Sequence, residues 1–170
     1  MNETYEVFFD RLNQLNTGDR AALRRSAGKM LPEAEGRALT VFYRCLPPGV
    51  PVYQEDRWFA VACLRCLWDA GEEGAQTLPQ IIRSLTESDN LSESAAHRVE
   101  ALMDTPWDSD GYMLSKLYRL VVLVRQKADR AAPDFSGLLD DLMAWNRDDQ
   151  RVQKNWAREI FSYNKLIKES

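Results

Sequence analysis

The 170-residue sequence predicts an all-α protein, a compact two-lobed bundle of about eight or nine helices with no sheet. Apolar residues recur at spacings of three and four, the period of an amphipathic helix, and no segment shows convincing strand alternation. Glycine, proline and capping residues separate the periodic segments. Because 45% of the residues are hydrophobic, a single domain over 1–170 is expected, with possible lobes at 1–105 and 106–170.

Four helices are expected before residue 72. The first has one apolar face, made by Tyr5, Phe8, Phe9, Leu12 and Leu15. The second opens near Thr17 and closes at Gly28, because glycine accepts the left-handed conformation past a helix end. The third runs from about residue 32 to 46, where the prolines of LPPGVP stop it. The fourth, QEDRWFAVACLRCLWDAG, is strongly apolar and ends at Gly71, which predicts the central helix of this half.

The remaining helices are predicted mainly from their caps. Thr77 is expected to cap a fifth helix, with a proline tolerated in its first turn. Asn90 and Glu93 have the spacing of a capping box and predict the start of a sixth. One long helix is expected over about residues 111–131, and Asp134 is expected to cap the next, in APDFSGLLDDLMAW. A last helix follows it.

The sequence gives no indication of a membrane protein. The uninterrupted apolar run at 120–124 is far too short to cross a bilayer. The N-terminal MNETYEVFF lacks the basic region and cleavage site of a signal peptide. We therefore expect a cytoplasmic protein with no membrane partner. Three cysteines cannot all pair with one another, and reduced thiols are expected.

Catalytic and metal sites are not predicted. His97 is the only histidine, and it lies on an expected surface helix with no nucleophile signature beside it. Cys63 and Cys66 form a CxxC in the middle of an apolar helix, whereas a redox pair normally lies at a helix N-terminus. A zinc site with Cys45 and His97 would lack the usual two ligand pairs. Buried thiols are favoured over a zinc or redox sensor, and no cofactor is expected.

The charges are segregated along the chain, although the formal net charge is −4. Between residues 55 and 110 there are twelve acidic residues and four basic ones. Residues 20–44 include six basic residues and only two acidic ones, and residues 116–130 include five basic residues and only one acidic residue. An acidic centre is therefore flanked by basic segments, which keeps an anionic partner possible.

Three expected helices carry cations opposite their apolar residues when they are projected at about 100° per residue. These cations are Arg20, Arg24 and Arg25 in GDRAALRRSAGK, Lys116, Arg119, Lys127 and Arg130 in the long helix, and Arg151, Lys154, Arg158 and Lys165 in the last helix, which is expected to reach about residue 167. A solvated helix face commonly carries cations as well, but such a face usually mixes in acids at i+4. The pattern alone does not decide between a solvated helix face and a face that contacts phosphates.

Three aromatic residues near these faces are candidates to stack on bases: Trp107, Tyr112 and Tyr118. Tryptophan is more often a core residue in a small helical protein.

Several ordered motifs resemble one known family. They are LNTGDRAALRR, VFYRCLPP, MLSKLYRLVVLV, DFSGLLDDLMAW and VQKNWAREIF, and they span nearly the whole chain. The sequence is similar to the small subunit of the type I-E CRISPR surveillance complex Cascade, the CasB family. One departure is Phe135 after Asp134, where the family often has tryptophan. The acidic middle of the chain matches poorly.

The resemblance implies a non-catalytic helical protein that lies as a pair of copies along the complex. Its implied partners are the Cascade backbone and large subunits, the guide RNA ribonucleoprotein, target DNA and a second copy of itself. In such assemblies the small subunits hold the R-loop open through basic surface along the target and displaced strands. The resemblance and the helix projections together predict eleven nucleic-acid-binding residues. They are Arg20, Arg24, Arg25, Arg44, Lys116, Arg119, Lys127, Arg130, Arg151, Lys154 and Arg158. The alternative is a structural adaptor whose basic faces meet only protein.

Overall fold

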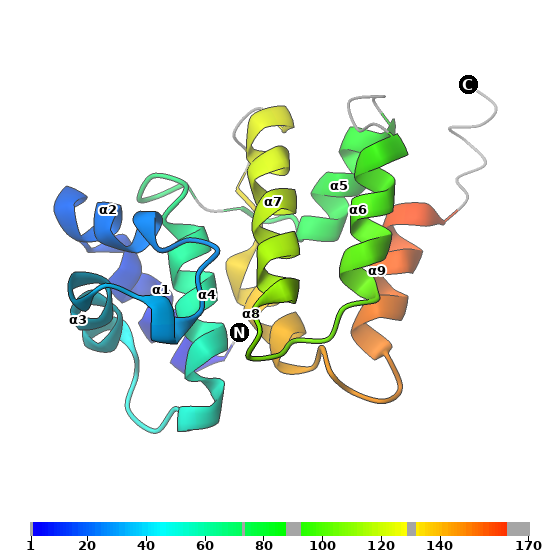
Figure 1. Ribbon diagram of the computed structural model, residues 1–170. Coiled ribbons are helices and arrows are strands. Elements are labelled where there is room, and N and C mark those ends of the chain that lie inside the picture. Colours follow the sequence, from blue (N-terminus) through cyan, green and yellow to red (C-terminus); the bar gives the residue numbers. More distant parts are fainter. Residues whose placement is uncertain (1, 73, 88–92, 129–131, 163–170) are drawn as a thin grey trace.

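The computed structural model describes residues 2–72, 74–87, 93–128 and 132–162, which fold into helices joined by short connections (Figure 1). No strand occurs within these ranges, so the all-α prediction is confirmed. The helices are α1 (Glu3–Asn13), α2 (Thr17–Arg25), α3 (Gly36–Cys45), α4 (Glu55–Arg65), α5 (Leu78–Glu87), α6 (Glu93–Met103), α7 (Tyr112–Lys127), α8 (Phe135–Met143) and α9 (Arg151–Phe161). Short 3-10 turns, η1 (Leu31–Glu33) and η2 (Val52–Gln54), precede α3 and α4.

Helix α7 stands between α1–α4 on one side and α5, α6 and α9 on the other (Figure 1). Helices far apart in the sequence pack together, α4 against α8 and α5 against α9. Helices α6 and α7 lie side by side and are joined by the connection 104–111. Each of these three helix pairs joins a helix before position 105 to one after it. The contacts do not test the predicted division into lobes at 1–105 and 106–170, which stays a prediction.

Helix α4 forms the centre of the first half, as its apolar sequence predicts. Every residue from Trp58 to Arg65 is buried. The ring of Phe8 in α1 meets the Trp58 ring edge-on at 4.9 Å between centroids. The ring of Phe42 in α3 meets that of Phe59 at 5.2 Å, also edge-on. Aromatic contacts therefore lock α1 and α3 onto two successive positions of α4.

The cysteines are buried and free, which confirms the interpretation of the CxxC as core. Burial raises the pKa of the Cys45 thiol to about 11 and raises that of Cys63 well above its ordinary value. These groups are therefore thiols, not reactive thiolates, at neutral pH. In the described ranges no group of three or more His, Cys, Asp or Glu side chains could hold a metal ion. No helix in those ranges has the length and apolarity needed to cross a membrane.

Three predicted caps have the expected geometry. Gly28 has φ of +86° in the turn after α2. The Thr77 hydroxyl accepts a hydrogen bond from the Gln80 N–H at 3.2 Å, and the Gln80 side chain accepts from the Thr77 N–H at 2.9 Å. The Asp134 carboxylate accepts from the Ser136 and Gly137 N–H groups at the start of α8. The Thr77 and Asp134 caps satisfy N–H groups that a helix start leaves unpaired, and Gly28 supplies the left-handed backbone conformation after α2.

Two helix boundaries differ from prediction. Helix α3 begins at Gly36, not near residue 32, because Glu33 accepts from the Met30 N–H and closes η1, after which the backbone is extended. Helix α4 ends at Arg65, six residues before Gly71. After Arg65, arginine side chains donate hydrogen bonds to the backbone carbonyls of Trp68 and Asp69. The capping box at Asn90 and the last turns predicted to residue 167 lie outside the described residues.

A half-buried carboxylate joins α8 to α9. The Trp156 indole N–H donates to Asp141 Oδ2 at 2.9 Å. Burial raises the pKa of Asp141 to about 6, the Trp156 hydrogen bond opposes this shift, and the charges of Asp140 and Glu159 add to it. The folded protein therefore keeps a proton on this side chain up to a higher pH than the unfolded chain does, and at pH 7 the folded state holds a carboxylate in unfavourable surroundings.

Replacing Asp141 with asparagine is expected to stabilise the protein near neutral pH. Because the folded pKa lies above the unfolded value of about 3.9, the favourable contribution is complete below about pH 4 and is lost as the pH rises through about 6. Asparagine keeps an acceptor for Trp156 without the partly desolvated charge, so the free energy of unfolding should rise by about 2 kcal/mol at pH 7. Urea unfolding at pH 4 and pH 7 measures this. An equal change at both pH values would contradict it.

Candidate nucleic-acid interface

Arg20 does not contribute to an exposed cationic face. Its side chain is buried, with 6% of the residue exposed. Its Nη1 donates to the Leu12 carbonyl at 2.9 Å, and its Nη2 donates to the Trp68 carbonyl at 2.6 Å. The prediction that Arg20 lies on the surface is wrong, because the turn after α4 covers that side of α2.

Arg24 and Arg65 share this structural role at the C-terminal end of α4. Arg24 Nε donates to the Cys66 carbonyl at 2.9 Å, and Arg65 Nη1 donates to the Asp69 carbonyl at 3.2 Å. A helix C-terminus has unpaired carbonyls and a negative dipole end, which guanidinium groups satisfy. Part of the cationic motif of α2 therefore caps α4. Arg24 remains exposed at the surface, so its other nitrogen atoms can still reach a partner.

Arg44 is partly neutralised within the protein. Arg37 and Arg44 both bind the carboxylate of Asp19, with Arg44 Nη2 at 2.8 Å from Asp19 Oδ2. Burial alone would raise the pKa of Asp19, but the hydrogen bonds from Arg37 and Arg44 outweigh burial and lower it. The Arg44 side chain is 55% exposed, so its outer side meets solvent while its inner side holds α2 against α3.

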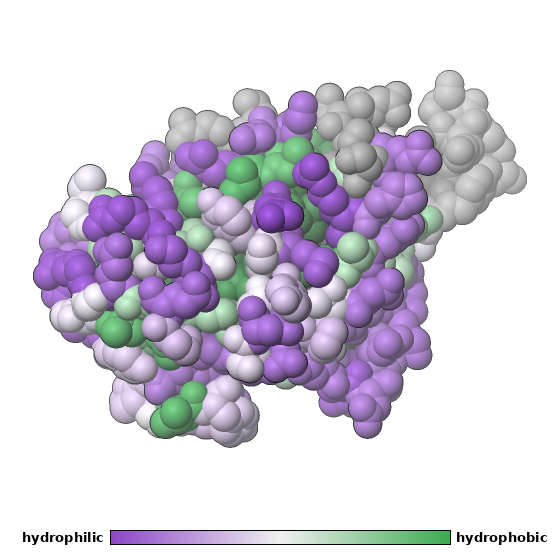
Figure 2. Space-filling model, viewed as in Figure 1, coloured by the Kyte–Doolittle hydropathy of each residue, from purple (hydrophilic) through white to green (hydrophobic). Residues whose placement is uncertain are grey.

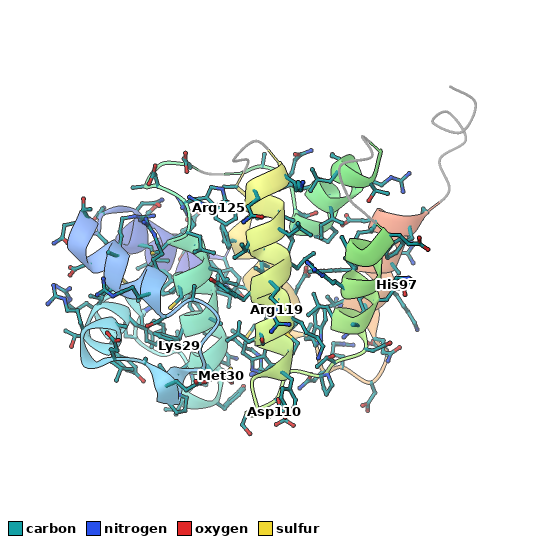
Figure 3. All side chains as sticks on the ribbon, turned by 45° about the horizontal axis from the view of Figure 1, so that its top comes forward. Lys29, Met30, His97, Asp110, Arg119 and Arg125 are labelled. Carbon is teal, nitrogen blue, oxygen red and sulfur yellow. The ribbon has the colours of Figure 1, made fainter. Side chains whose placement is uncertain are left out.

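The end of α2 lies against α7. A Cβ atom at Gly28 would come within 2.9 Å of the Tyr118 ring, so these two residues are in close contact. The next residue, Lys29, is exposed, as is Arg25 in the last turn of α2. Lys29 and Arg119 are both visible on the same side of the molecule (Figure 3). The structure therefore brings Lys29, the last residue of GDRAALRRSAGK, towards the cations of α7.

A groove runs along the open face of α7 beside α6, with a volume of about 570 Å³. Its lining residues are Arg98, Ala101, Lys116, Tyr118, Arg119, Val122, Leu123 and Gln126. None of these described residues is acidic. The Lys116 ammonium lies 5.9 Å from the centre of the exposed Tyr112 ring, which holds this lysine at one end of the groove. Two of the predicted cations, Lys116 and Arg119, thus converge with a third from another helix.

The other predicted cations lie elsewhere. Lys127 is exposed at the last residue of α7, and Arg130 lies outside the described residues. Arg151, Lys154 and Arg158 are exposed on α9, which packs against α5. None of these three lines the groove, so they lie apart from it on α9.

The sequence from residue 19 to 161 matches a family model described as CRISPR-associated protein Cse2. The chain belongs to the Cse2 family. The CRISPR-associated protein Cse2 of Thermus thermophilus is 33% identical over 163 residues, which cover 92% of this chain and 89% of that protein.

Solved structures agree with this Cse2 assignment. A crystal structure of CasB from Thermus thermophilus is 29% identical, has a TM-score of 0.75 and covers 96% of this chain and 100% of that chain. The resemblance of the sequence to the CasB family is therefore confirmed. A chain of a CRISPR RNA-guided surveillance complex, 23% identical with a TM-score of 0.73, has the same fold over 93% of this chain and 91% of that chain.

Arg98 is the residue of this Cse2 groove that sequence reasoning missed. It lies on α6 within the acidic middle of the chain, where a single arginine does not stand out. Its position becomes informative only when α6 and α7 are placed side by side, because α6 then presents Arg98 beside Lys116 and Arg119.

The aromatic candidates divide between core and surface. Trp107 is buried, and its indole N–H donates to Asp56 Oδ2 at 2.8 Å, so it serves the core of this Cse2 fold. Tyr112 is 66% exposed beside Lys116. Tyr118 is half-buried and lines the groove. Only the two tyrosines are therefore placed to meet a partner.

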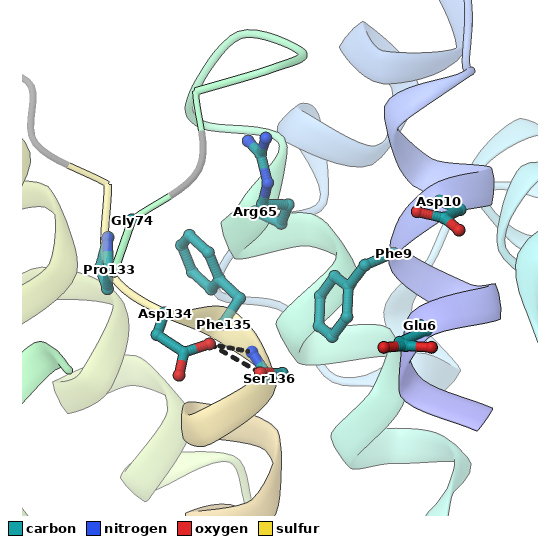
Figure 4. A pocket seen from close by; sticks show the side chains of 9 residues that line it. All are labelled: Glu6, Phe9, Asp10, Arg65, Gly74, Pro133, Asp134, Phe135 and Ser136. Atoms are coloured by element: carbon teal, nitrogen blue, oxygen red, sulfur yellow. Dashed lines mark hydrogen bonds between the residues drawn. The ribbon is translucent and has the colours of Figure 1, made fainter. Parts of the chain in front are cut away.

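A second pocket has the wrong charge for a phosphate. It lies between α1 and the start of α8, and carboxylates of Glu6, Asp10 and Asp134 line it with Arg65 (Figure 4). Asp134 is committed to capping α8, and Arg65 to the carbonyl of Asp69. The α6–α7 groove is therefore the better candidate site for an anionic partner.

Proposed function

We propose that this Cse2 chain is the non-catalytic small subunit of a type I-E CRISPR Cascade complex in the cytoplasm. It binds nucleic acid without reading its sequence and stabilises the R-loop by contacts to the backbones of the target and displaced strands. Its proposed partners are the backbone and large subunits, the guide RNA and a second copy of itself. Family membership supports this role, together with the occurrence of the same fold in a CRISPR RNA-guided surveillance complex.

The convergence of Arg98, Lys116 and Arg119 on one groove, with no acidic side chain among its described lining residues, is the observation that carries the proposal. Cations on rigid helices bind phosphates and release condensed counterions, which gives affinity without sequence preference. Guide pairing supplies the specificity of an R-loop, and the exchange of one duplex for another is nearly balanced. Backbone contacts of this kind are therefore sufficient to favour the open state.

The double variant Lys116→Ala/Arg119→Ala is expected to weaken binding of reconstituted complex to target DNA about tenfold at physiological salt. Each lost phosphate contact should reduce the slope of log K against log salt by roughly 0.7–0.9. Binding is measured by titration at several salt concentrations. The matched control is Arg11→Ala/Arg147→Ala, which removes the same charge from exposed positions outside the groove. Unchanged affinity and slope in the groove variant would contradict a phosphate role.

A structural adaptor is the second candidate, and the internal bonds of Arg20, Arg24 and Arg44 favour it for the α2–α3 region. An adaptor binds neighbouring subunits through its cations and has no affinity for DNA. A gel shift of the isolated chain at low and physiological salt separates the two. Weak, salt-sensitive binding supports nucleic-acid contact, whereas no binding together with loss of complex assembly in the groove variant supports the adaptor.

A further inference from the structure

The α6–α7 groove has an apolar part that phosphate binding does not require. Val122 and Leu123 line it from the C-terminal half of α7, and Ala101 lines it from α6. The side chains of Val122 and Leu123 are only half-buried. Figure 2 shows hydrophobic residues on this face, bordered by hydrophilic ones. A groove that bound only phosphates would leave this apolar surface in contact with water.

Cations and apolar groups alternate along one face of α7. Arg119 and Leu123 are four residues apart, and so are Tyr118 and Val122, so each pair lies in consecutive turns. The lining runs from Lys116 to Gln126, roughly 15 Å at the rise of an α-helix. Tyr118 forms the edge next to Gly28, and Arg98 and Ala101 form the edge on α6. A charged group and an apolar group of one ligand can therefore be bound side by side.

This arrangement matches a single strand better than a duplex. In a duplex the bases are stacked inside and only phosphates and groove edges face a protein. An unpaired nucleotide presents its phosphate and the face of its base together, and base faces pack on aromatic and apolar side chains whatever their identity. Gln126 adds one amide to the lining, which is too little to select a base.

We propose that the groove binds single-stranded nucleic acid, with a phosphate on Arg98, Lys116 and Arg119 and an unstacked base on Tyr118, Val122 and Leu123. This inference rests on the proposed function and adds to it a preference for single strands. Base contact also makes the strand harder to re-pair with its complement, because a base held on the protein is not free to stack or pair.

The test compares three probes on the full chain by fluorescence anisotropy: a short oligothymidine, the same backbone with abasic residues, and a duplex of equal length. The oligothymidine is expected to bind about tenfold more tightly than the abasic strand, because stacking contributes about 1–3 kcal/mol per base. Val122→Ala/Leu123→Ala should shrink that difference to about twofold or less without changing the salt slope. Lys116→Ala/Arg119→Ala should weaken both single strands equally.

The outcomes separate the two claims. Equal binding of oligothymidine and abasic strand by the unaltered chain overturns base contact and leaves phosphate binding in place. Tighter binding of the duplex also overturns it. Absence of salt-dependent binding to every probe overturns both the inference and the proposed function. The probe comparison on the unaltered chain decides the matter even if the double variant of Val122 and Leu123 fails to fold.

Discussion

Arg20→Met is expected to lower the free energy of unfolding by about 3 kcal/mol. Methionine fills a similar volume but has no donors for the carbonyls of Leu12 and Trp68, which Arg20 now binds at 2.9 and 2.6 Å. Each carbonyl would keep only a longer hydrogen bond, from the Leu15 N–H at 3.3 Å to Leu12 and from Arg65 Nη1 at 3.5 Å to Trp68. The substitution therefore removes two hydrogen bonds from a charged donor, and such bonds contribute about 1.5–3 kcal/mol each before the gain in apolar packing is set against them. For a chain of this size the melting temperature should fall by about 6–12 °C. Urea and thermal unfolding measure both quantities.

Arg25→Met is the control for this substitution. Arg25 lies in the last turn of the same helix and is exposed, so its loss should change the free energy of unfolding by less than about 0.5 kcal/mol. Arg20→Lys keeps the charge but loses the two-pronged geometry, and an intermediate loss is expected. If Arg20→Met left stability unchanged and weakened DNA binding, Arg20 would belong to the interface after all.

Local signals account for the parts of the fold that were predicted. Asp134, Thr77 and Gly28 act on their own helix ends, so their roles can be inferred from neighbouring residues alone. The end of α4 could not be inferred in this way. It depends on Arg20 and Arg24, which come from more than forty residues away in the sequence. A boundary determined by tertiary hydrogen bonds leaves no local signal.

The candidate site was predictable only in part, for a related reason. A helix projection shows that Lys116 and Arg119 lie opposite the apolar face of α7, and the structure places both at an open groove. The same projection placed Arg20 on a polar face but could not show that another segment covers that face. Arg98 had no signal at all, because its importance comes from the packing of α6 beside α7.

Gly28→Val is expected to lower the free energy of unfolding by about 3 kcal/mol, through two separate effects. Gly28 has φ of +86°, a region that costs an L-residue about 1–2 kcal/mol and a β-branched one more. A Cβ there would also lie 2.9 Å from Cγ of Tyr118, so the ring must move. Because Tyr118 lines the groove, the affinity for single-stranded DNA should fall as well. Thermal unfolding and anisotropy measure the two effects.

Gly49→Val separates the backbone effect from the steric one. Gly49 has φ of +90°, but a Cβ atom there would meet nothing within 4 Å, so this variant should lose only the backbone contribution, about 2 kcal/mol for a β-branched residue. The excess cost at Gly28 then measures the contact with Tyr118, and Tyr118→Ala should remove most of that excess in the double variant. Equal costs at Gly28 and Gly49 would show that α2 does not press on Tyr118. The end of α2 would then have no influence on the shape of the groove.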